Sequence, residues 1–98
     1  MAYPPPIIVG HGADNMKLVC YAVLPEDKRH TVMQSLAGPG PRQVCGLAIC
    51  DAAEDGFYLF TCDADWYVMF DTNHESLEDA LHQAEFEYNG IASRLRRL

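Results

Sequence analysis

Basic residues are scarce in this sequence, and over half of its length there are none. Seven lysines and arginines stand against fourteen aspartates and glutamates in 98 residues, a formal net charge of −7. Residues 43–93 contain eleven carboxylates and no lysine or arginine. Because nucleic acids are bound through basic side chains that neutralise phosphates, this composition argues against a nucleic-acid partner and favours a basic protein.

Long apolar segments and paired-cysteine motifs are also absent. No apolar run approaches the roughly 18 residues that a membrane-spanning helix requires, and no signal sequence stands at the N-terminus. The cysteines lie in apolar runs without the two-residue spacing of zinc or redox motifs: Cys20, Cys45, Cys50 and Cys62. We therefore expect buried free thiols, no membrane partner and a location in the reducing cytoplasm.

Motifs of the common catalytic and cofactor sites are missing as well. The sequence has no glycine-rich phosphate loop, no nucleophile elbow and no zinc motif. A chain of 98 residues suits one domain with a modest core and leaves no room for a separate cofactor domain. We expect a protein that is not an enzyme and that holds no cofactor or metal.

The first residues differ in composition from the rest. Residues 1–15 contain three consecutive prolines and two glycines around one short apolar run, which predicts a disordered leader. Residues 16–98 then form a single α+β domain. Its first strand is predicted over residues 16–24, which are rich in β-branched and aromatic side chains and end at Pro25.

Two weaker patterns follow this strand. Residues 25–36 predict a short helix, because three apolar side chains fall on one helical face: Val32, Met33 and Leu36. The Gly-Pro-Gly-Pro sequence of residues 38–41 predicts a loop, since proline donates no hydrogen bond to a strand ladder.

Three apolar runs bounded by turn residues predict an antiparallel meander. They cover residues 44–50, 57–62 and 66–70. Both faces of these strands are apolar. Either another part of the structure covers the second face, or two copies of the chain pair across it.

The clearest pattern is a helix between Ser76 and Gly90. Ser76 is a good N-cap, Asp79 stands three residues later in a capping-box-like position, and Asn89-Gly90 supplies a left-handed C-terminal turn. Apolar residues at spacings of three and four form one stripe: Leu77, Ala80, Leu81, Ala84 and Tyr88. We predict an α+β fold in which an antiparallel sheet of about four strands packs against this C-terminal helix.

One aromatic residue of the helix lies off the buried stripe. At about 100° per residue, Phe86 falls on the face predicted to meet solvent. Either the C-terminal tail shelters the ring with Leu95 or Leu98, or the ring contacts a partner, because aromatic side chains are enriched in interface cores. We take this face as the candidate interaction surface, with four residues: Phe86, His82, Asp79 and Gln83.

A histidine just before the helix is the candidate for chemistry. His74 is flanked by Asp71 and Glu75, and a carboxylate can orient an imidazole as a base or a metal ligand. A histidine in this position also commonly has a structural role, in which it hydrogen-bonds to a turn or a free backbone group. We keep both interpretations, the chemical and the structural one, for this candidate functional loop of Asp71, His74 and Glu75.

Three segments of the C-terminal part resemble a group of short bacterial proteins of uncharacterised function. They are residues 57–66 (FYLFTCDADW), 71–80 (DTNHESLEDA) and 83–91 (QAEFEYNGI). The resemblance covers roughly the C-terminal third and implies no activity, cofactor or partner. The group often has tryptophan where Asn73 stands, so this chain lacks an aromatic at the entrance to the helix.

The favoured function is a non-enzymatic cytoplasmic module that binds another protein, for which the charge favours a basic one, or a second copy of itself. One alternative is an immunity-type inhibitor of a basic toxin, which fits the size and charge. The other is a metal-binding or enzymatic site around His74.

Overall fold

The computed structural model describes residues 16–97 and has the predicted α+β class. The strands are β1 (Lys17–Val23), β2 (His30–Ser35), β3 (Gly38–Val44), β4 (Gly46–Asp51), β5 (Phe57–Cys62), β6 (Val68–His74) and β7 (Arg96–Arg97). The helices are α1 (Leu77–Glu87) and three short 3-10 helices, η1 (Glu26–Lys28), η2 (Ala53–Asp55) and η3 (Ile91–Arg94). The predicted leader, residues 1–15, lies outside the described residues.

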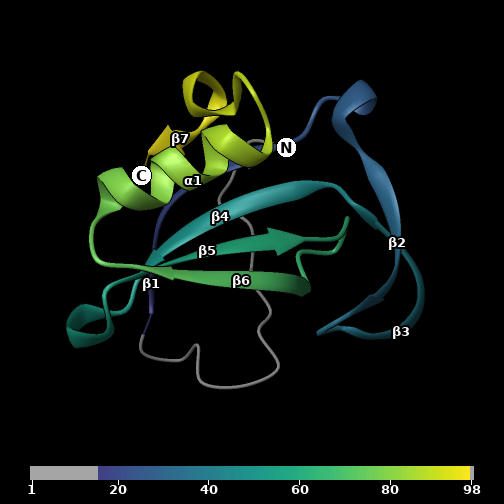
Figure 1. Ribbon diagram of the computed structural model, residues 1–98, viewed down its shortest axis with the longest axis horizontal. Helices are drawn as coiled ribbons and strands as arrows, with labels where there is room; N and C mark the ends of the chain where they lie inside the picture. The colour runs from purple at the N-terminus through teal and green to yellow at the C-terminus, as the bar shows by residue number, and fades with distance from the viewer. Residues whose placement is uncertain (1–15, 98) are drawn as a thin grey trace.

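Five strands form the main sheet in the order β6-β5-β4-β1-β7, and all neighbours are antiparallel (Figure 1). The predicted meander is confirmed as β4, β5 and β6, with the first predicted strand, β1, on its far side. The prediction of about four strands was too low. It missed the short β7 and a separate two-stranded sheet, β2-β3.

The β2-β3 hairpin corrects two predictions. The helix predicted over residues 25–36 is wrong, because a single turn at η1 is followed by strand β2. The predicted Gly-Pro-Gly-Pro loop is also wrong, because these residues lie in β3. A two-stranded ribbon leaves one edge of each strand unpaired, so prolines without an N–H are tolerated there. The Leu36 N–H donates to the Met69 carbonyl oxygen at 2.9 Å and ties the hairpin to β6.

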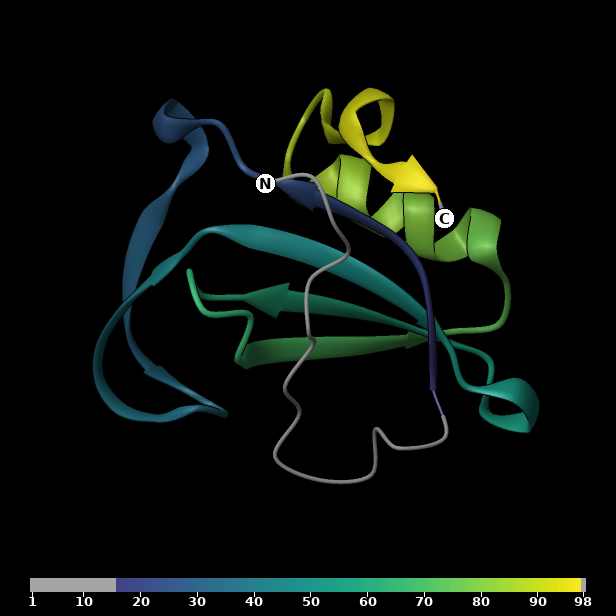
Figure 2. The same cartoon turned by 180° about the vertical axis from the view of Figure 1, so that it is seen from behind.

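Helix α1 lies over one face of the main sheet, as Figures 1 and 2 show. Its predicted apolar stripe packs against the core on that face. Ala80 and Ala84 are fully buried, which lets the helix approach the strands closely. The larger members of the stripe are partly buried and pack on the same core: Leu77, Leu81 and Tyr88. From the sheet, β4 and β5 contribute Leu47, Ile49 and Leu59 to this core.

The second face of the sheet is buried too. Its cluster comprises Ala48, Cys50, Phe60, Cys62, Trp66 and Val68. Trp66 lies so close to Gly46 that a Cβ there would come within 2.6 Å of the indole ring. Since these side chains are at most 5% exposed within one chain, burial of this face does not require a second copy.

Both ends of α1 follow the predicted capping pattern. The Ser76 hydroxyl oxygen accepts a hydrogen bond from the Asp79 N–H at 3.1 Å. Gly90 adopts the left-handed conformation with φ of +89°, and Ile91 after it is buried. The Asp79 side chain departs from the capping-box expectation, because it bonds to another side chain instead of the cap.

The basic C-terminal segment docks on its own chain. Strand β7 pairs with β1, with Arg96 opposite Tyr21 and Arg97 opposite Cys20. Leu95 packs against the core beneath α1. Among residues 16–97, no helix is both long enough and apolar enough to cross a membrane.

Candidate functional site

The side chain of His74, the last residue of β6, is buried and hydrogen-bonded through both ring nitrogens. Its Nδ1 lies 2.7 Å from Oδ2 of Asp79, and its Nε2 lies 2.7 Å from Oγ1 of Thr72. An ionised carboxylate only accepts hydrogen bonds, so Nδ1 carries the proton shared with Asp79. In the neutral ring, Nε2 then accepts the hydroxyl proton of Thr72.

Local structure brings these three groups together. Thr72 and His74 are two residues apart in β6, so their side chains point to the same face of the sheet. Asp79 lies in the first turn of α1, whose start is fixed by the Ser76 cap directly after β6. The strand-to-helix connection therefore places the Asp79 carboxylate over the end of the strand.

The two carboxylates predicted to orient His74 do not hydrogen-bond to its ring. Asp71 is three residues from His74 in β6 and points to the opposite face, while Glu75 is exposed. Within residues 16–97, the carboxylate hydrogen-bonded to this ring is that of Asp79. Two residues of the predicted loop, Asp71 and His74, belong to a strand. Thr72 was missed, although its spacing of two from His74 was the available signal.

A hydroxyl, an imidazole and a carboxylate joined in this order form the arrangement that activates hydroxyl nucleophiles. The same three groups also lock β6 to α1, which is a structural role. A metal ion at the imidazole would have to displace Thr72 or Asp79 from a ring nitrogen. No group of three or more candidate metal ligands occurs in the part of the chain that the structure describes.

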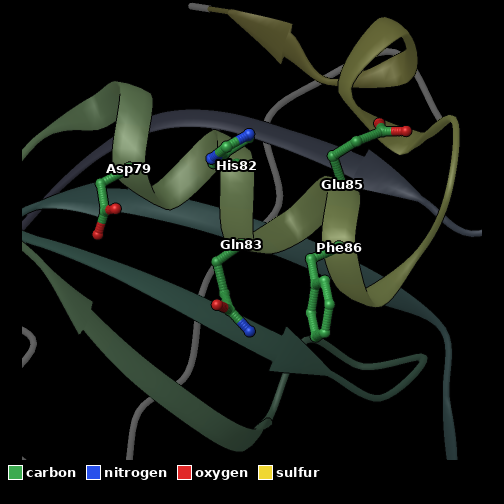
Figure 3. A pocket seen from close by; sticks show the side chains of 5 residues that line it. All are labelled: Asp79, His82, Gln83, Glu85 and Phe86. Carbon is green, nitrogen blue, oxygen red and sulfur yellow. The ribbon is translucent and has the colours of Figure 1, made fainter.

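The predicted interaction surface lies on the outward side of α1. Phe86 is 85% exposed, the largest exposure among the large apolar residues described. Asp79, Gln83 and Phe86 project from one side of the helix, and His82 and Glu85 project from the other (Figure 3). These five residues line one open hollow on the surface. The predicted surface is therefore contiguous.

The tail does not shelter Phe86 with Leu95, which corrects one of the two expectations for this ring. Leu95 packs into the core, and β7 joins the sheet at β1, at the opposite edge from β6. Leu98 lies outside the described residues. Phe86 stays open to solvent because α1 presents it on the β6 side of the molecule, away from the tail.

Two further carboxylates of α1 are used within the chain. Glu85 accepts hydrogen bonds from the Gly90 N–H at 2.6 Å and the Ala92 N–H at 3.0 Å. These two donors hold the pKa of Glu85 below its ordinary value. Glu87 accepts from the Gln83 amide at 2.7 Å. This role of Glu85 was not predicted, although a carboxylate five residues before a glycine turn is within reach of the free N–H groups there.

Comparison with protein-family models, with curated proteins and with solved structures found no match. The resemblance to short bacterial proteins therefore stays a prediction.

Proposed function

We propose that this protein is a non-enzymatic module of the cytoplasm that binds a basic protein through the outward side of α1. The single observation that carries this proposal is the exposure of Phe86 among carboxylates. Asp79 projects from the same side of α1, and Glu87 is the next residue along the chain. Four free buried cysteines are in keeping with the reducing location.

An exposed phenyl ring contributes little to folding and much to binding. Removing a side chain of this size from water stabilises a complex by about 1.5–3 kcal/mol. Aromatic anchors surrounded by polar residues are typical of the centres of protein interfaces. Phe86 has Gln83 beside it and Asp79 two turns away on the same side of the helix, which gives this surface that composition.

The charge of the chain favours a basic partner over a second copy. Residues 43–93 have no lysine or arginine, so two α1 surfaces brought face to face would repel each other. A homodimer through this side needs basic residues from outside 43–93 of one copy, such as the C-terminal arginines, to meet α1 of the other. A basic toxin, held by this chain as an immunity-type inhibitor, is one form of the favoured partner.

Affinity capture from the native host tests this proposal, with the wild type compared with Phe86→Ala and Met33→Ala. Met33 is the matched control, because it is also an exposed apolar residue, at 64%, but lies on β2. We expect a basic protein to bind the wild type and Met33→Ala, and to bind Phe86→Ala at least tenfold more weakly in a purified mixture. Equal binding by both variants contradicts the proposal.

The second candidate function is a reaction at the Thr72, His74 and Asp79 chain. The observation that favours it is the pair of 2.7 Å contacts, one at each nitrogen of the imidazole. Hydrolysis of an activated ester, compared between wild type, Thr72→Val and His74→Ala, tests this reaction. Metal analysis of the purified protein tests the metal form of the site. A rate in the wild type that both substitutions abolish supports this candidate, and equal rates remove it.

A further inference from the structure

The outer edge of β6 is open along most of its length. In the five-stranded sheet β6 is a terminal strand, paired with β5 alone (Figure 1). Within residues 16–97, its backbone makes one hydrogen bond outside this pairing, from the Leu36 N–H to the Met69 carbonyl oxygen. Beyond Met69, the side chains of Phe70, Asp71 and Asn73 are exposed. An open strand edge is a template for another strand.

Asp79 places one side of α1 above this edge. Its carboxylate bonds to His74 of β6, so the side of the helix that carries Asp79 lies over β6. Gln83 and Phe86 project from the same side (Figure 3). In Figure 1, α1 runs back along the sheet in the opposite direction to β6. Along α1, the distance from Asp79 to Phe86 is about 10 Å. Along β6, the distance from His74 back to Phe70 is roughly 13 Å, so the two segments have similar lengths.

Side chains along the edge alternate between two environments. His74 faces α1, so Thr72 and Phe70 also point to that side of the sheet, and Asp71 points to the other. The pairing with β5 agrees, because Leu59 opposite Thr72 packs in the core beneath α1, and Phe60 opposite Asp71 packs in the second cluster. A strand added here would meet Phe70 and α1 on one face and Asp71 on the other.

The acidic side chains near the outer edge of β6 determine which strands can pair with it. Two copies paired through β6 would bring their Asp71 carboxylates and the acidic sides of α1 together, and like charges on paired strands destabilise the pairing. A lysine or arginine opposite Asp71 has the reverse effect. We propose that the outer edge of β6 binds an extended basic segment of the partner protein as an added β-strand, alongside Phe70 and Asp71. This inference rests on the proposed function, because it assumes a basic protein partner.

A binding experiment with three synthetic peptides tests the inference. The probes are a seven-residue peptide alternating lysine and valine, the same peptide with glutamate for lysine, and the lysine peptide with every backbone nitrogen methylated. We expect the lysine peptide to bind and to shift the amide NMR signals of residues 70–73. Methylation removes the donors of the strand ladder, so we expect it to weaken binding at least tenfold, and the glutamate peptide to bind at least tenfold more weakly.

Asp71→Lys and Asp27→Lys provide the protein variants. Both positions are exposed and undergo the same charge change, but Asp27 lies in η1, outside the main sheet. We expect Asp71→Lys to lose lysine-peptide binding at least tenfold and Asp27→Lys to retain it within twofold. An equal loss in both variants would mean that net charge alone governs binding, and would overturn the inference.

The experiments distinguish a failure of the inference, that β6 binds an added strand, from a failure of the proposed function. If the methylated peptide binds as well as its parent and the shifts are confined to α1, the edge does not bind a strand, while the helix surface stands. If the lysine peptide does not bind at millimolar concentration, the inference is overturned. The proposed function is then decided by the Phe86→Ala capture experiment alone.

Discussion

The imidazole of His74 and the carboxylate of Asp79 lie 2.7 Å apart and join the last residue of β6 to the first turn of α1. The histidine is 8% exposed, whereas the Asp79 side chain is 60% exposed. This hydrogen bond thus links the buried end of the sheet to the surface proposed to bind a partner. The Thr72 hydroxyl is the hydrogen-bond partner of the other ring nitrogen, Nε2.

His74→Ala should destabilise the fold by about 1–3 kcal/mol, because the buried imidazole is removed and the half-buried Thr72 hydroxyl and the Asp79 carboxylate both lose their partner. The measurement is urea unfolding. Glu75→Ala is the control, since this exposed neighbour makes no contact with the ring, and its effect should stay within about 0.5 kcal/mol. Equal effects of the two substitutions would show that the hydrogen-bonded chain does not hold β6 to α1.

Gly56→Ala should destabilise the protein by at least about 2 kcal/mol. Gly56 has a φ of +85°, and an added Cβ would overlap the backbone carbonyl oxygen of His74, so the end of β6 would have to move. Gly90→Ala is the comparison, with a φ of +89° and no atom within 4 Å of the added Cβ. The ψ of Gly90 is −3°, in the left-handed helical region, whereas the ψ of Gly56 is −139°, so alanine at Gly56 also carries a larger backbone cost. Gly90→Ala should cost only the left-handed backbone penalty, about 1–2 kcal/mol.

Thermal or urea unfolding of the two glycine variants gives the comparison. A Gly56→Ala variant no less stable than Gly90→Ala would contradict the close packing of Gly56 against His74. A shift of the His74 ring signals in the NMR spectrum of Gly56→Ala alone would support it.

Several elements could be predicted from sequence because a local pattern and a tertiary role agree. The stripe of α1, its Ser76 cap and its Gly90 turn all point to one helix, and the apolar runs of β4 and β5 have strand length. The β2-β3 hairpin was missed because prolines oppose a ladder, and only the open edge of a two-stranded ribbon removes that conflict. Strand β7 was missed because a strand of two residues is too short to show an alternation of apolar and polar side chains.

The candidate site was predicted in part for a similar reason. His74 was predicted, but its partners were chosen by adjacency in sequence, whereas the start of α1 brings Asp79 to the ring and strand alternation decides which residues of β6 share its face. Asp71 fails that test and Thr72 passes it. Phe86 was placed correctly on the wet face because helical periodicity alone fixes its direction.

The cysteine thiols should react slowly with alkylating reagents in the native protein. All four are buried, and burial raises the pKa of Cys50 to about 11 and raises that of Cys62 as well. The thiolate is the reactive form, so little of it is present at pH 8. Mass spectrometry after iodoacetamide treatment should show unmodified chain under native conditions and four adducts in urea. Rapid native labelling of Cys50 would contradict this packing.

Glu85 should make stability depend on pH in the acidic range. Its folded-state pKa is lowered from 4.5 by the N–H groups of Gly90 and Ala92, so the ionised form binds better in the folded state. This contribution is present above the unfolded pKa and is lost as the pH falls through the lower folded pKa. Wild type should therefore exceed Glu85→Gln in stability at pH 7, and the difference should shrink below about pH 4.5.

Urea unfolding at a series of pH values measures this difference for Glu85→Gln and for Glu54→Gln. Glu54 is the control, because it is exposed in η2 and no backbone N–H of residues 16–97 donates to its carboxylate. Its substitution should change stability little at any pH. A difference for Glu85→Gln that stays constant from pH 7 to pH 3 would mean that the charge of Glu85 does not hold the turn at Gly90. The left-handed glycine and the burial of Ile91 would then be enough to end α1.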